Sequence, residues 1–216
     1  MRLIHFLNED IFDVIELKDI KEKIQKECKP WLIASKGYPV WRGMRNPASG
    51  KFKVRTERKP LDTPLDVHIK LNEIFKKHFG WQCRSEGLLT TGDRTVASSY
   101  GNAHQIFPIG KFRFVWSKNV HDLYSIYVEL ISKQGITYAG GGDWKQTNLP
   151  KQQDPKTLVV KSDDLYLSKK ELASYKNIIF KQLDDLIKKE YSDKNIVQAI
   201  NSLNEIMINC KEYYAI

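Results

Sequence analysis

The chain is organised around one stretch, Tyr38-Pro39-Val40-Trp41-Arg42-Gly43. Apolar residues lead to a charged residue and a glycine, which predicts a short strand that ends on an arginine and then turns. Two later stretches are expected to lie beside it: Leu88-Leu89-Thr90-Thr91-Gly92 and Asn204-Glu205-Ile206-Met207-Ile208. Together, the three stretches would bring an arginine, two hydroxyls and one glutamate onto neighbouring strands.

The composition is that of an ordinary globular protein. The chain has 216 residues, 41% of them hydrophobic and 28% charged, which suits one sizeable core and is marginal for two domains. The formal charge of +9 favours a polyanionic partner such as nucleic acid, an anionic membrane or a phosphate-rich small molecule. Lysines on solvated helix faces explain the same charge equally well.

The three cysteines, Cys28, Cys83 and Cys210, are far apart and form no C-x-x-C pair. Neither a zinc site nor a disulfide framework is therefore indicated, and reduced thiols are expected. The N-terminus does not resemble a signal peptide, and no apolar run reaches the roughly 18 to 20 residues that a membrane span requires. We expect a cytoplasmic protein that does not enter a membrane.

Hydrophobic periodicity and turn residues predict an α+β chain without a clear linker. Pro30 should kink or restart an N-terminal helix that ends near Gly37. Thr63 should cap a helix whose first residue is Pro64, and Ser192 should cap a short helix near the end. The remaining expected strands cover 83–91, 105–109, 111–116, 157–161 and 205–210, and the remaining helices cover 96–100, 119–132 and 168–189.

The polar segment from Met44 to Lys59 is the most basic part of the chain and is expected to be a loop. Its cations make it either a flexible solvated loop or a surface for phosphates or nucleic acid; they are Arg45, Lys51, Lys53, Arg55, Arg58 and Lys59. A glycine triplet at 140–142 precedes Trp144, but it lacks the spacing of a phosphate-binding motif. We expect a mobile loop there, with Trp144 as a substrate contact. His68 and His78 lie on the helix after Pro64 and are expected to be packed or solvated.

The order of these motifs is similar to that of the ADP-ribosyltransferase superfamily. The chain most resembles the branch whose core is an arginine, a Ser-Thr-Ser motif and a glutamate, and it looks like small phage- or prophage-encoded members. The likeness spans Trp41-Arg42-Gly43, Thr90-Thr91-Gly92, Ala97-Ser98-Ser99-Tyr100-Gly101 and Glu205-Ile206-Met207-Ile208. It implies a single α+β domain with a split mixed or antiparallel β core. In that domain, residues 1–37 would form a helical N-terminal cover and residues 38–216 the catalytic core.

The resemblance also implies an activity, namely cleavage of NAD at the nicotinamide glycosidic bond and transfer of ADP-ribose to a macromolecule. Glu205 would stabilise the cationic sugar, and no metal would be needed. The residues expected to bind NAD are Arg42, Gly43, Thr90, Thr91, Tyr100 and Phe107. The residues expected to bind the acceptor are Arg45, Lys51, Lys53, Arg55, Arg58 and Trp144.

Two departures from the family pattern bear on the acceptor. The serine-led motif is written with Thr90 and Thr91, and Leu203 stands where many members carry Glu or Gln, two residues before the glutamate. Because leucine cannot hydrogen-bond an acceptor, arginine-directed modification is disfavoured. Nucleic acid is slightly favoured as acceptor on charge, while a protein-directed transferase, an NAD glycohydrolase and a non-catalytic nucleic-acid-binding protein remain alternatives. The chain could act as a toxin neutralised by an antitoxin or as a phage effector, and the sequence does not distinguish them.

Overall fold

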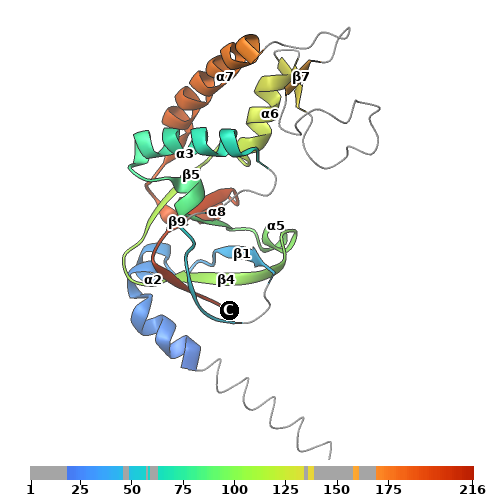
Figure 1. Ribbon diagram of the computed structural model, residues 1–216. Helices are drawn as coiled ribbons and strands as arrows, with labels where there is room; N and C mark the ends of the chain where they lie inside the picture. The colour runs from blue at the N-terminus through green and yellow to red at the C-terminus, as the bar shows by residue number, and fades with distance from the viewer. Residues whose placement is uncertain are drawn as a thin grey trace, which may run out of the picture.

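The protein is described by a computed structural model that covers residues 19–45, 49–56, 58, 63–133, 136–138, 158–160 and 169–216. It is one α+β domain built on a large antiparallel sheet with helices packed around it (Figure 1). Within the described residues the sheet has eight strands in the order β2-β10-β4-β1-β3-β9-β5-β8. These strands are β1 Trp41–Met44, β2 Gly50–Lys53, β3 Leu88–Thr91, β4 Asn102–Pro108, β5 Arg113–Ser117, β8 Tyr191–Ser192, β9 Glu205–Asn209 and β10 Glu212–Ala215.

Seven α-helices lie within the described residues, besides the helical segment at 19–27. They are α2 Lys29–Ser35, α3 Leu65–Phe79, α4 Cys83–Glu86, α5 Arg94–Ser98, α6 Leu123–Lys133, α7 Lys169–Glu190 and α8 Ile196–Asn201. A separate pair of short strands, β6 Ile136–Tyr138 and β7 Leu158–Val160, lies beside α6 (Figure 1).

The large sheet consists of two halves that meet between β1 and β3. Every strand pairing in it is antiparallel, and most pairs run over three or four residues. By contrast, β1 and β3 pair only at Trp41 and Thr91. The half β2-β10-β4-β1 and the half β3-β9-β5-β8 therefore diverge on either side of one contact, which leaves space between their strands.

The two faces of the sheet bury two different cores, because successive side chains of a strand point to opposite faces. On β9, Ile206 and Ile208 belong to one cluster while Met207 belongs to the other. On β5, Trp116 and Val115 divide in the same way. The helix over 19–27, α2 and α8 contribute to the first core, and α3, α6 and α7 contribute to the second.

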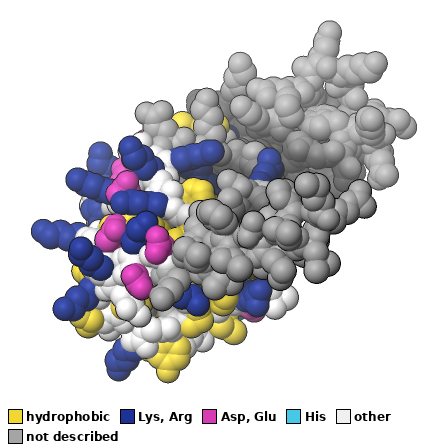
Figure 2. Space-filling view, turned by 90° about the horizontal axis from the view of Figure 1, so that it is seen from below, with side chains coloured by type: hydrophobic (Ala, Val, Ile, Leu, Met, Phe, Trp, Pro, Cys, Tyr) yellow, Lys and Arg dark blue, Asp and Glu magenta, His cyan; other side chains and the backbone are white. Residues whose placement is uncertain are grey.

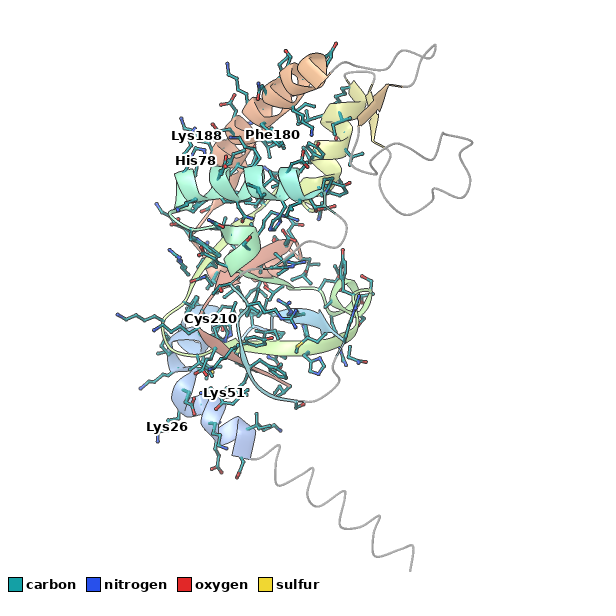
Figure 3. The ribbon with its side chains drawn as sticks, viewed as in Figure 1. Lys26, Lys51, His78, Phe180, Lys188 and Cys210 are labelled. Carbon is teal, nitrogen blue, oxygen red and sulfur yellow. The ribbon has the colours of Figure 1, made fainter. Side chains whose placement is uncertain are left out.

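Polar contacts fasten the helices over the second core to one another. Asp184 of α7 accepts hydrogen bonds from Lys77 Nζ and His78 Nε2 of α3, each at 2.6 Å. Figure 3 shows His78 beside α7, close to Lys188 and Phe180, and well away from Lys51 and Cys210 in the lower part of the molecule. His78 therefore joins two helices, as expected of a packed histidine.

Several expected elements are confirmed with small shifts. Pro30 lies in the first turn of α2, so it restarts the helix, and Lys36 and Gly37 end it with positive φ angles of 53° and 75°. Phe112 and Phe114 lie on the Trp116 side of β5, while Arg113 stacks on Trp81 at 5.0 Å. All three cysteines are buried free thiols.

Four local expectations were wrong. The segment Cys83–Glu86 is a helix, so only Leu88–Thr91 of the expected strand is extended. Gly50–Lys53 is a strand within the expected basic loop, because β10 supplies a pairing edge that no local pattern reveals. Pro64 occupies the N-cap position of α3, with no side-chain cap. Asn195 caps α8 by accepting from Gln198 N, in place of Ser192.

No helix within the described ranges is long and apolar enough to cross a membrane.

Candidate active site

A cavity of about 470 Å³ opens where the two halves of the sheet diverge. Its walls come from β1, β3, the start of β9, α5 and the N-terminal part of α3. The volume lies within the range usual for small-molecule sites. The lining residues are Trp41, Arg42, Gly43, Arg58, Thr63, His68, Arg84, Leu89, Thr90, Thr91, Val96, Ala97, Tyr100, His121, Asp122, Tyr124, Leu203, Asn204 and Glu205.

This cavity brings together most of the residues expected to bind NAD or to act on it. Arg42 and Gly43 come from β1, Thr90 and Thr91 from β3, and Glu205 from β9, and Tyr100 lies just after α5. Thr91 and Glu205 are direct partners in the β3–β9 register. Phe107 is not part of the lining: it lies on β4 opposite Tyr214 and is buried in the first core. The side chain of Tyr100 is 73% exposed at the cavity.

Arg42 places a guanidinium group in this cavity without a full set of partners. Its Nη1 is buried and makes no hydrogen bond to any described residue. Burial lowers the pKa of the Arg42 guanidinium below its ordinary value, because the pocket disfavours the isolated charge. An arginine stays protonated in proteins, so this nitrogen is a charged donor that no described residue satisfies.

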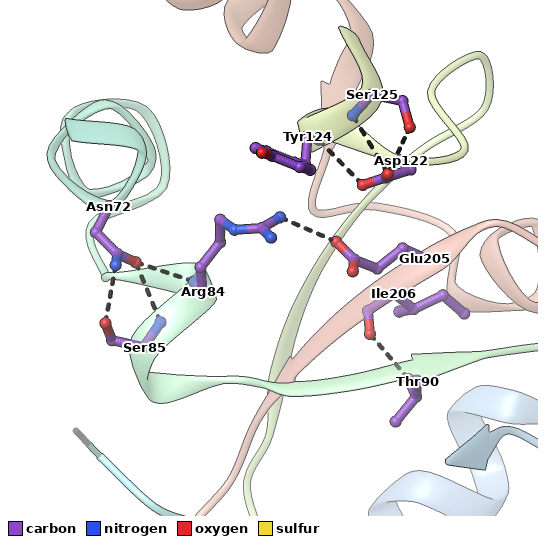
Figure 4. Close-up of polar contacts among 9 residues, drawn as sticks. All are labelled: Asn72, Arg84, Ser85, Thr90, Asp122, Tyr124, Ser125, Glu205 and Ile206. Carbon is purple, nitrogen blue, oxygen red and sulfur yellow. Dashed lines mark hydrogen bonds and ion pairs between the residues drawn. The ribbon is translucent and has the colours of Figure 1, made fainter. Parts of the chain in front are cut away.

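Glu205 is a partly buried carboxylate beside a second arginine. Its side chain is 24% exposed, and Arg84 Nη1 lies 3.5 Å from its Oε1 (Figure 4). Burial raises the pKa of the Glu205 carboxyl above its ordinary value, the Arg84 cation opposes that rise, and the Asp122 carboxylate adds to it. Arg58 also lowers this pKa, and the balance of burial and these charges determines how much carboxylate is present.

The two threonine hydroxyls fix the strand that carries Glu205. Thr90 Oγ1 donates to the carbonyl of Ile206 at 2.8 Å (Figure 4). Thr91 Oγ1 donates to the carbonyl of Leu203 at 2.8 Å and accepts from Asp93 N. In this structure the hydroxyls therefore hold β9 and the turn before it, and each retains acceptor capacity toward a ligand.

Leu203 closes the turn that leads into β9. Its φ of 62° is unusual for a leucine, and its side chain is half exposed at the cavity. The hydrogen bond from Thr91 holds its carbonyl. The contact with Thr91 therefore helps to hold Leu203 in a backbone conformation that a leucine rarely adopts.

Two glycines allow the walls of the cavity to approach each other. A Cβ on Gly43 would lie 2.2 Å from the Ala97 carbonyl oxygen, so α5 can pack on β1 only because no side chain intervenes. A Cβ on Gly92 would lie 1.9 Å from the Ile200 carbonyl oxygen, at the end of α8. Glycine thus follows Arg42 and Thr91 for a steric reason, because a side chain at either position would overlap a neighbouring backbone.

The residues expected to bind the acceptor are dispersed. Arg58 lines the cavity, and Arg45 is exposed at the end of β1. Lys51 and Lys53 lie on the edge strand β2, and Arg55 is exposed after it. Trp144 and the glycine triplet lie outside the described residues, so their roles stay predictions.

Carboxylates from other parts of the chain lie beside the described part of the basic segment 44–59. Lys51 lies 3.4 Å from Glu27 and 3.0 Å from Glu212. Figure 2 shows a mixed surface on the described part of the face seen from below, with Asp and Glu side chains among many Lys and Arg. Lys51 is therefore a weak candidate for a phosphate contact.

Four charged or polar residues of the cavity were not singled out by sequence reasoning as a site: Arg84, His121, Asp122 and Asn204. His68, which was expected to be packed or solvated, also lines the cavity, and its Nε2 lies 2.9 Å from Ser85 Oγ. Asn204 directly precedes Glu205, and its buried Oδ1 finds no partner among the described residues. The signal that could have found it is this adjacency, whereas nothing local marks Arg84.

No protein-family model, curated protein or solved structure matches this chain. Among the described residues, no group of three or more His, Cys, Asp or Glu side chains gathers to hold a metal ion.

Proposed function

We propose that this protein is a mono-ADP-ribosyltransferase that cleaves NAD at the nicotinamide glycosidic bond. One observation carries the proposal: residues from three strands far apart in sequence, Arg42, Thr91 and Glu205, line one cavity at the junction of the sheet halves. The divergence of the two halves also supports the expected split β core of the superfamily that the sequence resembles.

The chemistry of the cavity suits a ligand with a diphosphate and a ribose. Arg42 offers a buried guanidinium nitrogen that has no partner among the described residues, and a guanidinium fork binds phosphate oxygens well. Glu205 would stabilise the positive charge that develops on the nicotinamide ribose as the glycosidic bond breaks, as a carboxylate does in glycoside cleavage. Tyr100 offers an exposed ring that can stack either on the nicotinamide or on an acceptor base.

The test of this proposal is Glu205→Gln. The purified variant should bind NAD as the unmodified chain does but release nicotinamide at least about 100-fold more slowly, because an amide cannot stabilise the cation. The matched control is Glu86→Gln, because Glu86 also pairs with an arginine, Arg113, at 3.6 Å, but outside the cavity. Undiminished release by Glu205→Gln, or equal loss in both variants, contradicts the assignment.

For the acceptor, we favour an unpaired base of RNA or DNA. Arg58 lines the cavity, and an exposed ring at the mouth, Tyr100, can stack on a base. Trp41 is already covered by Arg94, which lies 5.2 Å from its ring. The formal charge of +9 favours a polyanion.

A second candidate is NAD hydrolysis or transfer to a protein. Leu203 favours hydrolysis or an acceptor other than arginine, since an apolar side chain at the cavity offers no hydrogen bond to an arginine acceptor. Incubating the protein with labelled NAD and cell lysate, then treating separately with nuclease and protease, distinguishes the acceptors. Nuclease-sensitive label supports nucleic acid, protease-sensitive label supports a protein, and free ADP-ribose alone supports hydrolysis. Nucleic-acid binding without any nicotinamide release would indicate a non-catalytic binding protein.

A further inference from the structure

Arg84 is the buried cation of the cavity that no sequence motif indicates. It lies on the short helix α4, and only 9% of its side chain is exposed. Its Nη1 lies 3.5 Å from Glu205 Oε1, as Figure 4 shows, and its Nε makes no hydrogen bond to a described residue. Burying a charge costs free energy unless the charge is paired. Among the described residues, the single contact with the Glu205 carboxylate is therefore the feature that must explain why Arg84 is buried here.

The main chain of Arg84 is held in place by α3. Asn72 Oδ1 accepts hydrogen bonds from Arg84 N at 3.0 Å and Ser85 N at 3.1 Å, and Asn72 Nδ2 donates to Ser85 Oγ at 2.8 Å (Figure 4). Asn72 is itself buried. The Arg84 guanidinium therefore extends toward Glu205 from a main chain that Asn72 holds in place. A side chain supported in this way can orient another side chain.

A carboxylate lies on another wall of the cavity. Asp122 is fixed there because its oxygens accept hydrogen bonds from Tyr124 N and Ser125 N at the start of α6 (Figure 4). Without Arg84, Glu205 would face this second negative charge in a partly buried site. Both the burial and the like charge favour the protonated form of Glu205.

We infer that Arg84 is a positioning residue for Glu205, which it holds through Oε1 and whose negative charge it balances inside the cavity. Within the described residues the Glu205 carboxylate forms no second hydrogen bond or ion pair, so Oε2 is left for the ligand. The inference rests on the proposed function in that the ligand of Oε2 would be the nicotinamide ribose.

The inference predicts how activity depends on pH. Arg84 lowers the pKa of Glu205 against the effect of burial, so the acid limb of activity should move to higher pH when Arg84 loses its charge. The groups that face Glu205 or share its cavity come from several elements: Arg42 of β1, Arg58, His68 of α3, Arg84 of α4, Tyr100, His121, Asp122, Tyr124 of α6 and Tyr191 of β8. If the acid limb of the pH–activity profile reports the titration of a histidine, its pH should not change in Glu205→Asp.

The experiment compares Arg84→Gln and Arg84→Lys in nicotinamide release from pH 5 to pH 9. For Arg84→Gln, the acid limb of kcat/KM should move up by about one pH unit, so release falls about tenfold at pH values below both limbs and recovers toward pH 9. Arg84→Lys keeps the charge and should retain the limb near its original pH. Arg113→Gln is the matched control, since it removes an arginine from the exposed Glu86 pair, and it should leave the limb in place.

A second measurement needs no ligand and separates this inference from the proposed function. In urea unfolding at pH 8, the double variant Arg84→Gln/Glu205→Gln should be more stable than Arg84→Gln alone, because removing Arg84 leaves a partly buried carboxylate unpaired. If the unmodified chain releases no nicotinamide, the proposed function fails, and this double-mutant cycle alone decides whether Arg84 and Glu205 are coupled.

Three results would overturn the inference. An unchanged acid limb in Arg84→Gln removes the electrostatic role. A loss of the same factor at every pH indicates a structural role, and a loss confined to NAD affinity makes Arg84 a ligand contact. If Arg84→Gln does not fold, Asn72→Ser supplies the test, because it releases α4 while leaving both charges in place; an unshifted limb in that variant equally contradicts a positioning role.

Discussion

At the scale of one residue, Arg42 is a cation of the cavity with a buried nitrogen that no described residue satisfies. Its Nη1 is buried without a hydrogen-bond partner among the described residues, and burial lowers the pKa of the guanidinium. An unsatisfied buried donor destabilises a fold by about 1 to 3 kcal/mol. Such groups persist in proteins chiefly where function requires them.

We therefore expect Arg42→Met to raise the free energy of unfolding of the ligand-free protein by about 1 kcal/mol. The same variant should lose NAD affinity by at least about tenfold, since methionine cannot bind a phosphate oxygen. Urea unfolding and calorimetric titration with NAD measure the two effects. Lower stability together with unchanged affinity would remove Arg42 from the binding site.

At the scale of the elements, close contact between backbones determines the shape of the cavity. Strand β3 ends at Thr91, and Gly92 then packs directly against the end of α8. Because α8 leads through Leu203 into β9, the position of α8 also determines where Glu205 lies. The site thus depends on a contact in which no functional group takes part.

Gly92→Ala should destabilise the fold by about 1 to 3 kcal/mol, because the new methyl group would overlap the Ile200 carbonyl and must displace α8. Nicotinamide release should fall as well, since Glu205 moves with the turn. Gly50→Ala is the control: its nearest neighbour would be Phe52 Cε2 at 3.9 Å, and a stability change within about 0.5 kcal/mol is expected. Equal effects in thermal unfolding would show that the α8 contact is not tight.

At the scale of the whole molecule, the excess positive charge is one guide to the proposed acceptor. The chain carries 35 Lys and Arg against 26 Asp and Glu, but the structure shows that they are not all available. Lys51 has two carboxylate neighbours, whereas Arg55 is exposed and lies close enough to Arg42 to contribute to lowering its pKa. For binding a polyanion, the position and partners of each cation therefore matter more than the net charge of the chain.

If the acceptor is single-stranded nucleic acid, its affinity should fall with salt, with a slope of log K against log salt near −0.7 for each phosphate contact. Arg55→Gln should reduce the slope by about that amount. Lys51→Gln should leave it unchanged, because this lysine is already paired with Glu27 and Glu212. Fluorescence anisotropy with a labelled oligonucleotide checks both, and an equal response of the two variants would contradict the phosphate contact assigned to Arg55.

Reasoning from the sequence reached most of the elements and much of the cavity. Periodicity located α3 and β5, and turn chemistry placed the restart at Pro30, because these signals are local. The basic segment shows the limit, since β2 is extended only where β10 pairs with it. Cys83–Glu86 was likewise mistaken for strand, because Asn72, on α3, supplies the hydrogen bonds that begin the helix.

The sequence by itself determined the order of the motifs, the class of the fold and the identity of Arg42, Thr90, Thr91 and Glu205 as candidates, because each has a signature within a few neighbouring residues. Only the tertiary structure decided that the two halves of the sheet diverge at Trp41 and Thr91 and leave a cavity there. Only it brought Arg84 to Glu205, across 121 positions of the chain. An ion pair of this kind depends on how α4 packs over β9, and no local pattern encodes that distance.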